Sequence, residues 1–251
     1  MNTDIDRLLK RFAPITLSEM NGVKLMNRTD TKFVTSRQRL TRLLLMACEE
    51  YRIVEIDGWR NIPYATTYFD TGDFNMFTTH VTGRLNRQKL RVRSYLSSNL
   101  HFLEVKTKDN HRRTKKNRIT VDDKNILLPE RLAFLHSYLN YDPHELSPSL
   151  DNTFNRITLV NADKTERLTI DTDLHFHNPQ TSTWFSDPRL VVVELKRDGK
   201  AHSPIQDMLL QLRIHPHGFS KYCMGLSLTS EGLRTNRLKP KIMEIKNILT
   251  A

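Results

Sequence analysis

Residues 89–95 alternate between polar and apolar side chains, and this pattern constrains the fold more than any other stretch of the chain. Successive side chains of a β-strand point to opposite faces of the sheet. Lys89, Arg91 and Arg93 therefore share one face, while branched apolar residues share the other. Like charges on one strand face are usually solvated. Taken alone, the stretch predicts an exposed or edge strand.

The same alternation recurs in four further stretches, at residues 25–34, 101–108, 167–171 and 191–196. Each stretch places charged side chains on one strand face and mainly branched apolar side chains on the other. The charged positions are Arg28, Asp30, Lys32, Glu104, Lys106, Lys108, Arg167, Asp171, Glu194 and Lys196. A sheet built from these strands has one apolar face and one face that carries charges of both signs.

Such a sheet can close into a barrel whose apolar face is covered by helices and whose charged face points inward. Unpaired buried charge is strongly unfavourable, so this interior needs a charged ligand. Basic residues exceed acidic residues on the predicted inner face, which indicates a polyanion, and the few carboxylates are available for a divalent metal. The residues therefore favour an α+β fold with a charged tunnel for phosphates.

The whole chain is basic as well. Its 251 residues include 39 Lys and Arg against 28 Asp and Glu, which gives a formal net charge of +11. This surplus predicts an acidic partner, such as nucleic acid, anionic lipid, a nucleotide or polyphosphate, and does not choose among them. We expect a single domain over residues 1–251, with its core at about 20–230.

Neither a secretory signal nor an apolar run of transmembrane length is visible, so we expect a cytoplasmic protein that is not integral to a membrane. Cys48 and Cys223 are far apart in the sequence and are predicted to be buried free thiols. The chain has no Walker loop, no Rossmann glycine fingerprint and no Ser-His-Asp motif.

Helical and loop signals fill the regions between the predicted strands. Pro129 begins a predicted helix over residues 129–140. Two prolines make residues 141–150 the most linker-like segment, which we interpret as an internal connection. The basic run at residues 110–118 is predicted to be a solvated hairpin loop, with a funnel for a polyanion as the alternative. A basic amphipathic helix at residues 238–249 is a candidate to close one tunnel mouth.

The order of short motifs along the chain resembles the VTC domain family over about residues 20–230. The motifs are Arg28-Thr-Asp30-Thr-Lys32-Phe, Tyr68-Phe-Asp70-Thr, Lys89-Leu-Arg91-Val-Arg93, Glu104-Val-Lys106, Phe154-Asn-Arg156, Arg167-Leu-Thr-Ile-Asp171, Glu194-Leu-Lys196 and Ser220-Lys221-Tyr222. VTC domains are the catalytic domains of polyphosphate polymerases and their bacterial relatives, within the CYTH-like triphosphate tunnel metalloenzymes. The resemblance implies an eight-stranded antiparallel β-barrel with helices packed on its outside.

The resemblance also implies roles for individual residues. The basic residues that resemble the catalytic phosphate cage are Lys32, Lys89, Arg91, Arg93, Lys106, Arg156, Arg167 and Lys221. Further predicted substrate contacts are Arg28, Tyr68, Lys108, Lys196 and Ser220. Glu194 resembles the carboxylate that holds Mn²⁺ or Mg²⁺, and Asp30, Glu104 and Asp171 are the other candidate ligands. The implied reaction transfers the γ-phosphoryl group of ATP to a growing polyphosphate and releases ADP.

One departure from the wider superfamily concerns the first charged strand. Triphosphatase and cyclase members typically begin with Glu-x-Glu-x-Lys, whereas Arg28, Asp30 and Lys32 occupy these positions here. The loss of one acid removes a metal ligand or a group that positions water. A phosphate acceptor is already anionic and needs no general base, so this departure favours transfer over hydrolysis.

Three other functions remain open from the sequence. A hydrolase acting on triphosphate, polyphosphate or a nucleotide would have the same fold and cage, and only its products would distinguish it. A non-catalytic polyphosphate-binding module would have no need for the metal ligands Glu194 and Asp30. Nucleic-acid binding is disfavoured because basic residues inside a barrel cannot grip a duplex. A membrane partner would have to be a separate protein.

Overall fold

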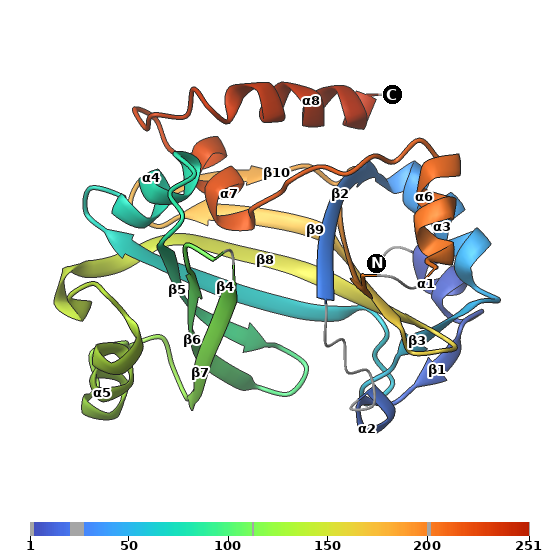
Figure 1. The fold of residues 1–251 in the computed structure, drawn as a ribbon, viewed down its shortest axis with the longest axis horizontal. Coiled ribbons are helices and arrows are strands. Elements are labelled where there is room, and N and C mark those ends of the chain that lie inside the picture. The colour runs from blue at the N-terminus through green and yellow to red at the C-terminus, as the bar shows by residue number, and fades with distance from the viewer. Residues whose placement is uncertain (1–2, 21–27, 112, 200–201, 251) are drawn as a thin grey trace.

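The computed structural model describes residues 3–20, 28–111, 113–199 and 202–250, and it has an α+β fold built on one large, mainly antiparallel sheet (Figure 1). The strands are β1 (Ala13–Ile15), β2 (Arg28–Ser36), β3 (Tyr51–Val54), β4 (Ile62–Thr71), β5 (Arg87–Tyr95), β6 (Leu100–Lys108), β7 (Thr114–Val121), β8 (Leu146–Asn161), β9 (Glu166–Asn178), β10 (Thr183–Ser186) and β11 (Leu190–Asp198). The helices are α1 (Thr3–Leu9), α2 (Leu17–Met20), α3 (Arg37–Ala47), α4 (Asn75–Val81), α5 (Pro129–Tyr138), η1 (Pro143–Glu145), α6 (Pro204–Gln211), α7 (Lys221–Thr229) and α8 (Lys239–Thr250).

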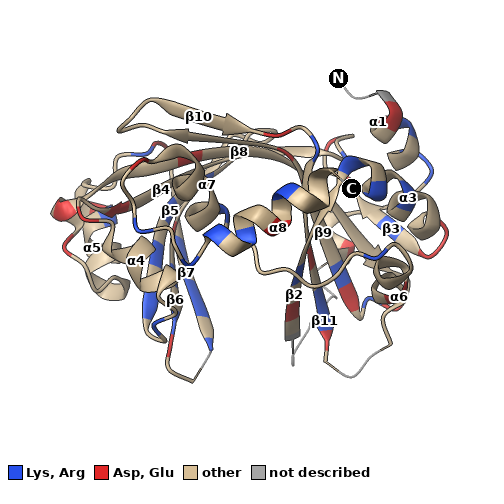
Figure 2. Ribbon diagram, turned by 90° about the horizontal axis from the view of Figure 1, so that it is seen from above, with Lys and Arg blue, Asp and Glu red and all other residues tan. Residues whose placement is uncertain are grey.

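The principal strands follow the order β2-β11-β9-β8-β4-β5-β6-β7, and every neighbouring pair along this path is antiparallel. In the described part of the chain no ladder joins β2 to β7, so the expected closed barrel is a curled sheet with two free edges. Figure 2 shows the result as two walls that are joined by β8 and β4. One wall consists of β5, β6 and β7, and the other consists of β2, β11 and β9.

Helices cover the convex side of the sheet, as the apolar strand faces predict. On one wall α1, α3 and α6 pack against β2, β9 and β11, with Leu40 and Leu44 in contact with a core that includes Ile170 and Val193. On the other wall α5 contributes Leu135 to a second buried cluster behind β5 and β6. Burial of these branched side chains is the main contribution to the stability of both walls.

The expectation that all helices pack outside the sheet is wrong for α7. Its Tyr222 and Met224 share a buried cluster with Tyr68, Leu150 and Phe154, whose side chains extend from the concave side of β4 and β8. The helix therefore lies between the two walls, where Figure 2 also places it, with α8 crossing nearby.

Two segments differ from their sequence-based description. The linker-like stretch 141–150 contains η1 and the first residues of β8. Next to Pro148 the strand has a bulge, which lies opposite Tyr68 and Phe69 on β4. A bulge tolerates proline because one residue is left out of the hydrogen-bond ladder. Most of the basic run 110–118 is not a loop, because β7 begins at Thr114. The predicted start of the first charged strand, at residues 25–27, lies outside the described residues.

Cys48 and Cys223 are buried free thiols, as expected. The helix predicted at residues 238–249 is α8, and Ile245 and Leu249 on it are buried against the same cluster as α7. None of the helices in the described residues combines the length and the apolar character required to cross a membrane.

Candidate active site

Strand register brings the predicted charged positions together on the concave surface of the sheet, which we call the charged face. Along β5 and β6, Lys89 lies opposite Lys106 and Arg91 lies opposite Glu104. Along β8, β9, β11 and β2, the cross-strand pairs are Arg156 with Asp171, Arg167 with Lys196, Thr169 with Glu194, Glu194 with Lys32, and Lys196 with Asp30. Every second side chain of a strand points to the same face of the sheet, and the register aligns these positions across neighbouring strands. Residues that are distant in the sequence therefore form one continuous surface.

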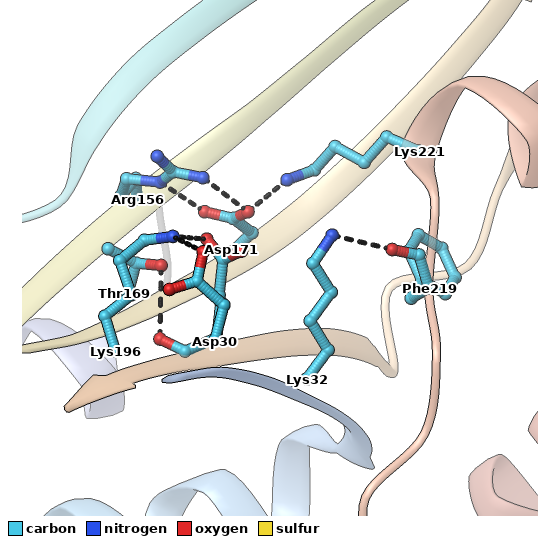
Figure 3. A network of polar contacts seen from close by, with 9 residues as sticks. Asp30, Lys32, Arg156, Thr169, Asp171, Lys196, Phe219 and Lys221 are labelled. Carbon is cyan, nitrogen blue, oxygen red and sulfur yellow. Dashed lines mark hydrogen bonds and ion pairs between the residues drawn. The ribbon is translucent and has the colours of Figure 1, made fainter. Parts of the chain in front are cut away.

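The first polar cluster of the charged face is centred on Asp171 (Figure 3). Arg156 donates two hydrogen bonds to this carboxylate, from Nε at 2.6 Å and from Nη2 at 2.8 Å, and Lys221 Nζ donates to Oδ2. Burial raises the pKa of Asp171, but the charges of Arg156 and Lys221 outweigh it and hold the pKa below its usual value. Both oxygens of Asp171 are therefore engaged by cationic groups.

The second cluster is centred on Glu104, whose side chain is 1 % exposed. It forms ion pairs with Arg91 Nη2 at 2.6 Å and with Lys116 Nζ at 2.6 Å. Burial opposes ionisation of Glu104, yet the charges of Arg91 and Arg93 lower its pKa to about 2. Glu104 thus orients the guanidinium of Arg91 on the charged face.

The third cluster consists of Lys196 and two carboxylates. Lys196 Nζ lies 3.1 Å from Asp30 Oδ2 and 2.9 Å from Glu194 Oε2. Burial raises the pKa of Glu194, but the charges of Lys32 and Lys196 lower it to about 2. Glu194 is therefore ionised at any physiological pH.

Two other cations of the charged face donate hydrogen bonds to neutral groups. Lys32 Nζ donates to the carbonyl oxygen of Phe219 at 2.9 Å, and Lys89 Nζ donates to Ser220 Oγ at 2.9 Å. Within the described residues, the Nε of Arg93 is buried without a hydrogen-bond partner. Positive charge on the charged face is therefore only partly neutralised by the protein itself.

Crowding and burial of these cations change their acid–base properties. Burial, followed by the charges of Lys32 and Lys106, lowers the pKa of Lys89 to about 8. Burial and the charge of Lys32 lower the pKa of Lys106 to about 8. The pKa of Lys221 falls to about 7 because burial outweighs the attraction of Asp171. Each lowered pKa reports that a further negative charge would be favourable here.

Ser220 and Tyr68 also lie on this surface. Ser220 is the N-cap of α7, where its Oγ accepts from Cys223 N at 3.3 Å, so the helix begins at Lys221 beside the charged face. Tyr68 lies opposite Arg91 in the β4–β5 ladder and stacks on Tyr222 at a centroid distance of 5.0 Å. Lys108 continues the same strand face two residues beyond Lys106. Arg28 lies opposite Asp198 in the backbone ladder, and its side chain is outside the described part of the structure.

The sequence identifies neither Lys116, which belongs to the charged face, nor the nearby His80. The sequence predicts Lys116 in a solvated loop, because residues 114–118 include no apolar side chain, but in the β6–β7 ladder Lys116 lies opposite Lys106. His80, near the end of α4, carried no sequence signal. Burial and the charges of Lys89 and Arg87 lower the pKa of His80 to about 2, so its imidazole is neutral.

The carboxylates differ in how well they fit a divalent metal. Among the described residues no three His, Cys, Asp or Glu side chains gather into a metal site. Asp171 and Glu104 are each held between two cationic side chains, which disfavours a further cation there. Asp30 and Glu194 share one ammonium group and supply hard oxygen donors. Magnesium is commonly bound by one or two carboxylates plus substrate phosphates, and these two residues fit that pattern.

Comparison with known proteins gives one family. The model of the VTC domain family matches residues 27–230 of the chain. No curated protein sequence matches it. A solved structure from Bacillus halodurans, provisionally described as an adenylate cyclase, has a TM-score of 0.51 at 14% identity and covers 78% of this chain and 96% of that chain.

A protein from Hippeastrum, provisionally described as an adenylyl cyclase with a dominant triphosphatase activity, has a TM-score of 0.47 at 12% identity. The match covers 83% of this chain and 99% of that chain. At this level of identity the likeness to the Bacillus halodurans structure is a likeness of fold alone.

Proposed function

The chain belongs to the VTC domain family, and from that premise we propose that it is a metal-dependent polyphosphate polymerase. The observation that carries the proposal is the surplus of cationic groups on the charged face, beside the two carboxylates of Asp30 and Glu194. A linear polyanion with evenly spaced charges neutralises such a surface along its whole length. In this proposal the substrates are ATP and inorganic polyphosphate.

The cage residues act by alignment and charge stabilisation. Phosphoryl transfer demands little covalent chemistry from the protein, so positioning and electrostatics supply most of the rate. Guanidinium groups bind phosphate oxygens bidentately, and ammonium groups supply point charges. The proposed phosphate-binding groups are Lys32, Lys89, Arg91, Arg93, Lys106, Lys116, Arg156, Arg167 and Lys221.

The proposed reaction is an in-line displacement at the γ-phosphorus of ATP. A terminal oxygen of the bound polyphosphate forms the new bond, the bond between the γ-phosphorus and the β,γ-bridging oxygen breaks, and ADP leaves with the bond electrons. Mn²⁺ or Mg²⁺, held by Glu194 and Asp30, would neutralise charge on the phosphates as a Lewis acid. Arg156 and Lys221 are already oriented by Asp171 and so lose little freedom when phosphate binds.

The acid–base properties of the site favour transfer to phosphate over hydrolysis. Activation of water calls for a general base with a pKa near the working pH. Glu104, Glu194 and His80 each have a pKa lowered to about 2, which makes them weak bases. The lysines with a pKa of about 7 to 8 are protonated again when phosphate binds beside them, so they are not free to act as bases then. A phosphate oxygen is already anionic and needs no such base. A tunnel-type triphosphatase, which would have the same cage, is the second candidate.

Product analysis tests the proposal. Purified protein is incubated with ATP and Mn²⁺, with and without a short polyphosphate primer, and the products are resolved on a polyacrylamide gel alongside ADP and free phosphate. We expect long chains and ADP with little free phosphate. Glu194→Gln should abolish the chains, whereas Glu49→Gln, in the exposed turn after α3, should not. Free phosphate without chains would identify a triphosphatase, and polyphosphate binding without either product would identify a binding module.

A further inference from the structure

The position of Lys196 suggests a role beyond substrate contact. Its ammonium group contacts two carboxylates, Asp30 at 3.1 Å and Glu194 at 2.9 Å. Figure 3 shows Lys196 beside Asp30. The Lys196 side chain is 14% exposed, whereas Glu194 is 23% and Asp30 35% exposed, so water can reach the carboxylates more easily than the ammonium group. One cation thus bridges two carboxylates that strand register holds on the same face.

Backbone geometry fixes the two carboxylates independently of Lys196. Asp30 on β2 lies directly opposite Lys196 on β11, and Glu194 precedes Lys196 by two residues on the same strand face. Two carboxylates this near each other repel unless a cation lies between them. The ammonium of Lys196 therefore lies where a divalent cation with oxygen ligands would be bound by the same pair.

We propose that Lys196 is a tethered counter-ion, which occupies the metal position of the empty protein and leaves it when metal and phosphate bind together. This inference rests on the proposed function, because it takes Asp30 and Glu194 as the metal ligands. Lys196 lies opposite Arg167 in the β9–β11 ladder, so an ammonium that swings away from the carboxylates stays on the charged face. There it can pair with a substrate phosphate oxygen.

Two consequences follow for binding. The empty protein should hold a divalent cation weakly, because the cation has to displace an internal charge at short distance. Metal affinity should rise when phosphate is present, since phosphate supplies both new ligands and a new partner for Lys196. Lysine suits this exchange because its ammonium is a compact charge on a flexible stem, whereas arginine has a rigid planar fork.

The test is a titration of the nucleotide-free protein with Mn²⁺, in which free Mn²⁺ is measured by electron paramagnetic resonance. Lys196→Met and Lys196→Gln should bind Mn²⁺ at least about tenfold more tightly than the wild type, because the competing charge is gone. Lys196→Arg retains the charge and should stay near the wild-type affinity. With saturating triphosphate, the difference between wild type and Lys196→Met should shrink.

A matched control separates specific competition from a general loss of positive charge. Lys89→Met removes one ammonium from the charged face, but Lys89 donates to Ser220 and forms no ion pair with a carboxylate among the described residues. Its Mn²⁺ affinity should change by less than about threefold. The inference is overturned if folded Lys196→Met and Lys196→Gln bind Mn²⁺ like the wild type, or if Lys89→Met tightens binding equally.

This experiment is independent of the polymerase assay. If the wild type makes polyphosphate and the Lys196 variants gain no affinity for Mn²⁺, the counter-ion inference alone fails. If those variants gain affinity and the wild type makes no polyphosphate, the counter-ion inference holds and the proposed function fails.

Discussion

At the scale of single residues, Asp171 explains how the charged face holds its cations in place without a ligand. Its side chain is 6% exposed, and it accepts hydrogen bonds from both Arg156 and Lys221. Both cations come from different elements, β8 and α7, so this one carboxylate ties the inserted helix to the sheet. We therefore interpret Asp171 as a positioning residue for the proposed cage and not as one of the proposed metal ligands.

Asp171→Asn tests this interpretation. The variant leaves two buried cations without their counter-charge, and breaking a buried ion pair in this way typically costs about 3–5 kcal/mol. The free energy of unfolding in denaturant should fall by that order without phosphate, and triphosphate should restore part of it. Asp163→Asn, in the exposed turn before β9, is the control and should have no effect. Unchanged stability combined with weaker Mn²⁺ binding would instead identify Asp171 as a metal ligand.

At the scale of secondary-structure elements, the close approach of α7 to the sheet depends on Gly225. A Cβ atom at this position would lie 2.4 Å from Phe176 Cδ1 and 2.6 Å from Leu150 Cδ2. Glycine in a helix is unfavourable by up to about 1 kcal/mol, so its presence here reflects packing and not helix propensity. The same helix begins with Ser220 and Lys221, which links this packing to the charged face.

Gly225→Ala should therefore weaken both stability and ligand binding. Overpacking of a core contact typically costs about 1–3 kcal/mol, and displacement of α7 would move Lys221 away from Asp171. We expect a lower free energy of unfolding and a higher Kd for triphosphate. Gly72→Ala is a suitable control, because a Cβ there meets no atom within 4 Å. Wild-type stability of Gly225→Ala would show that α7 is not held against the sheet in this way.

Much of this element-level arrangement was predictable, and the exceptions have physical reasons. Strand alternation predicts which side of each strand is charged, because register preserves a period of two across the whole sheet. It could not place α7, since the apolar run after Tyr222, which includes Cys223 and Met224, predicts a short strand, whereas the structure has a helix there. Nor could it identify Lys116, because a strand whose outer face is also polar carries no apolar alternation.

At the scale of the whole molecule, the net charge of +11 and the charged face act in the same direction. Three lysines of the site are partly uncharged at about pH 8. Burial and mutual repulsion lower the pKa of Lys89 and Lys106 to about 8 and that of Lys221 to about 7. A bound polyanion favours the ammonium form and raises these pKa values again. Binding should therefore be linked to proton uptake.

The sign of this linkage differs between stability and binding. Unfolded lysines titrate near pH 10.4, so between about pH 7 and 10 the unfolded chain binds more protons than the folded one. The empty protein should thus gain stability from these lysines as the pH rises through that range. Affinity for phosphate should fall over the same range, because fewer of the lysines are charged before the ligand arrives.

Isothermal titration calorimetry with ATP in EDTA measures the linkage without turnover. At pH 8 we expect uptake of about one to two protons per ATP, obtained from the dependence of the heat on the ionisation enthalpy of the buffer. At pH 6 uptake by these lysines should be near zero, because they are already protonated. Lys221→Met should lower the uptake at pH 8 by close to one proton, while Lys246→Met, on the exposed side of α8, should leave it unchanged. Equal heats in all buffers at pH 8 would mean that these lysines are charged in the empty protein, and that the charged face is already prepared for phosphate.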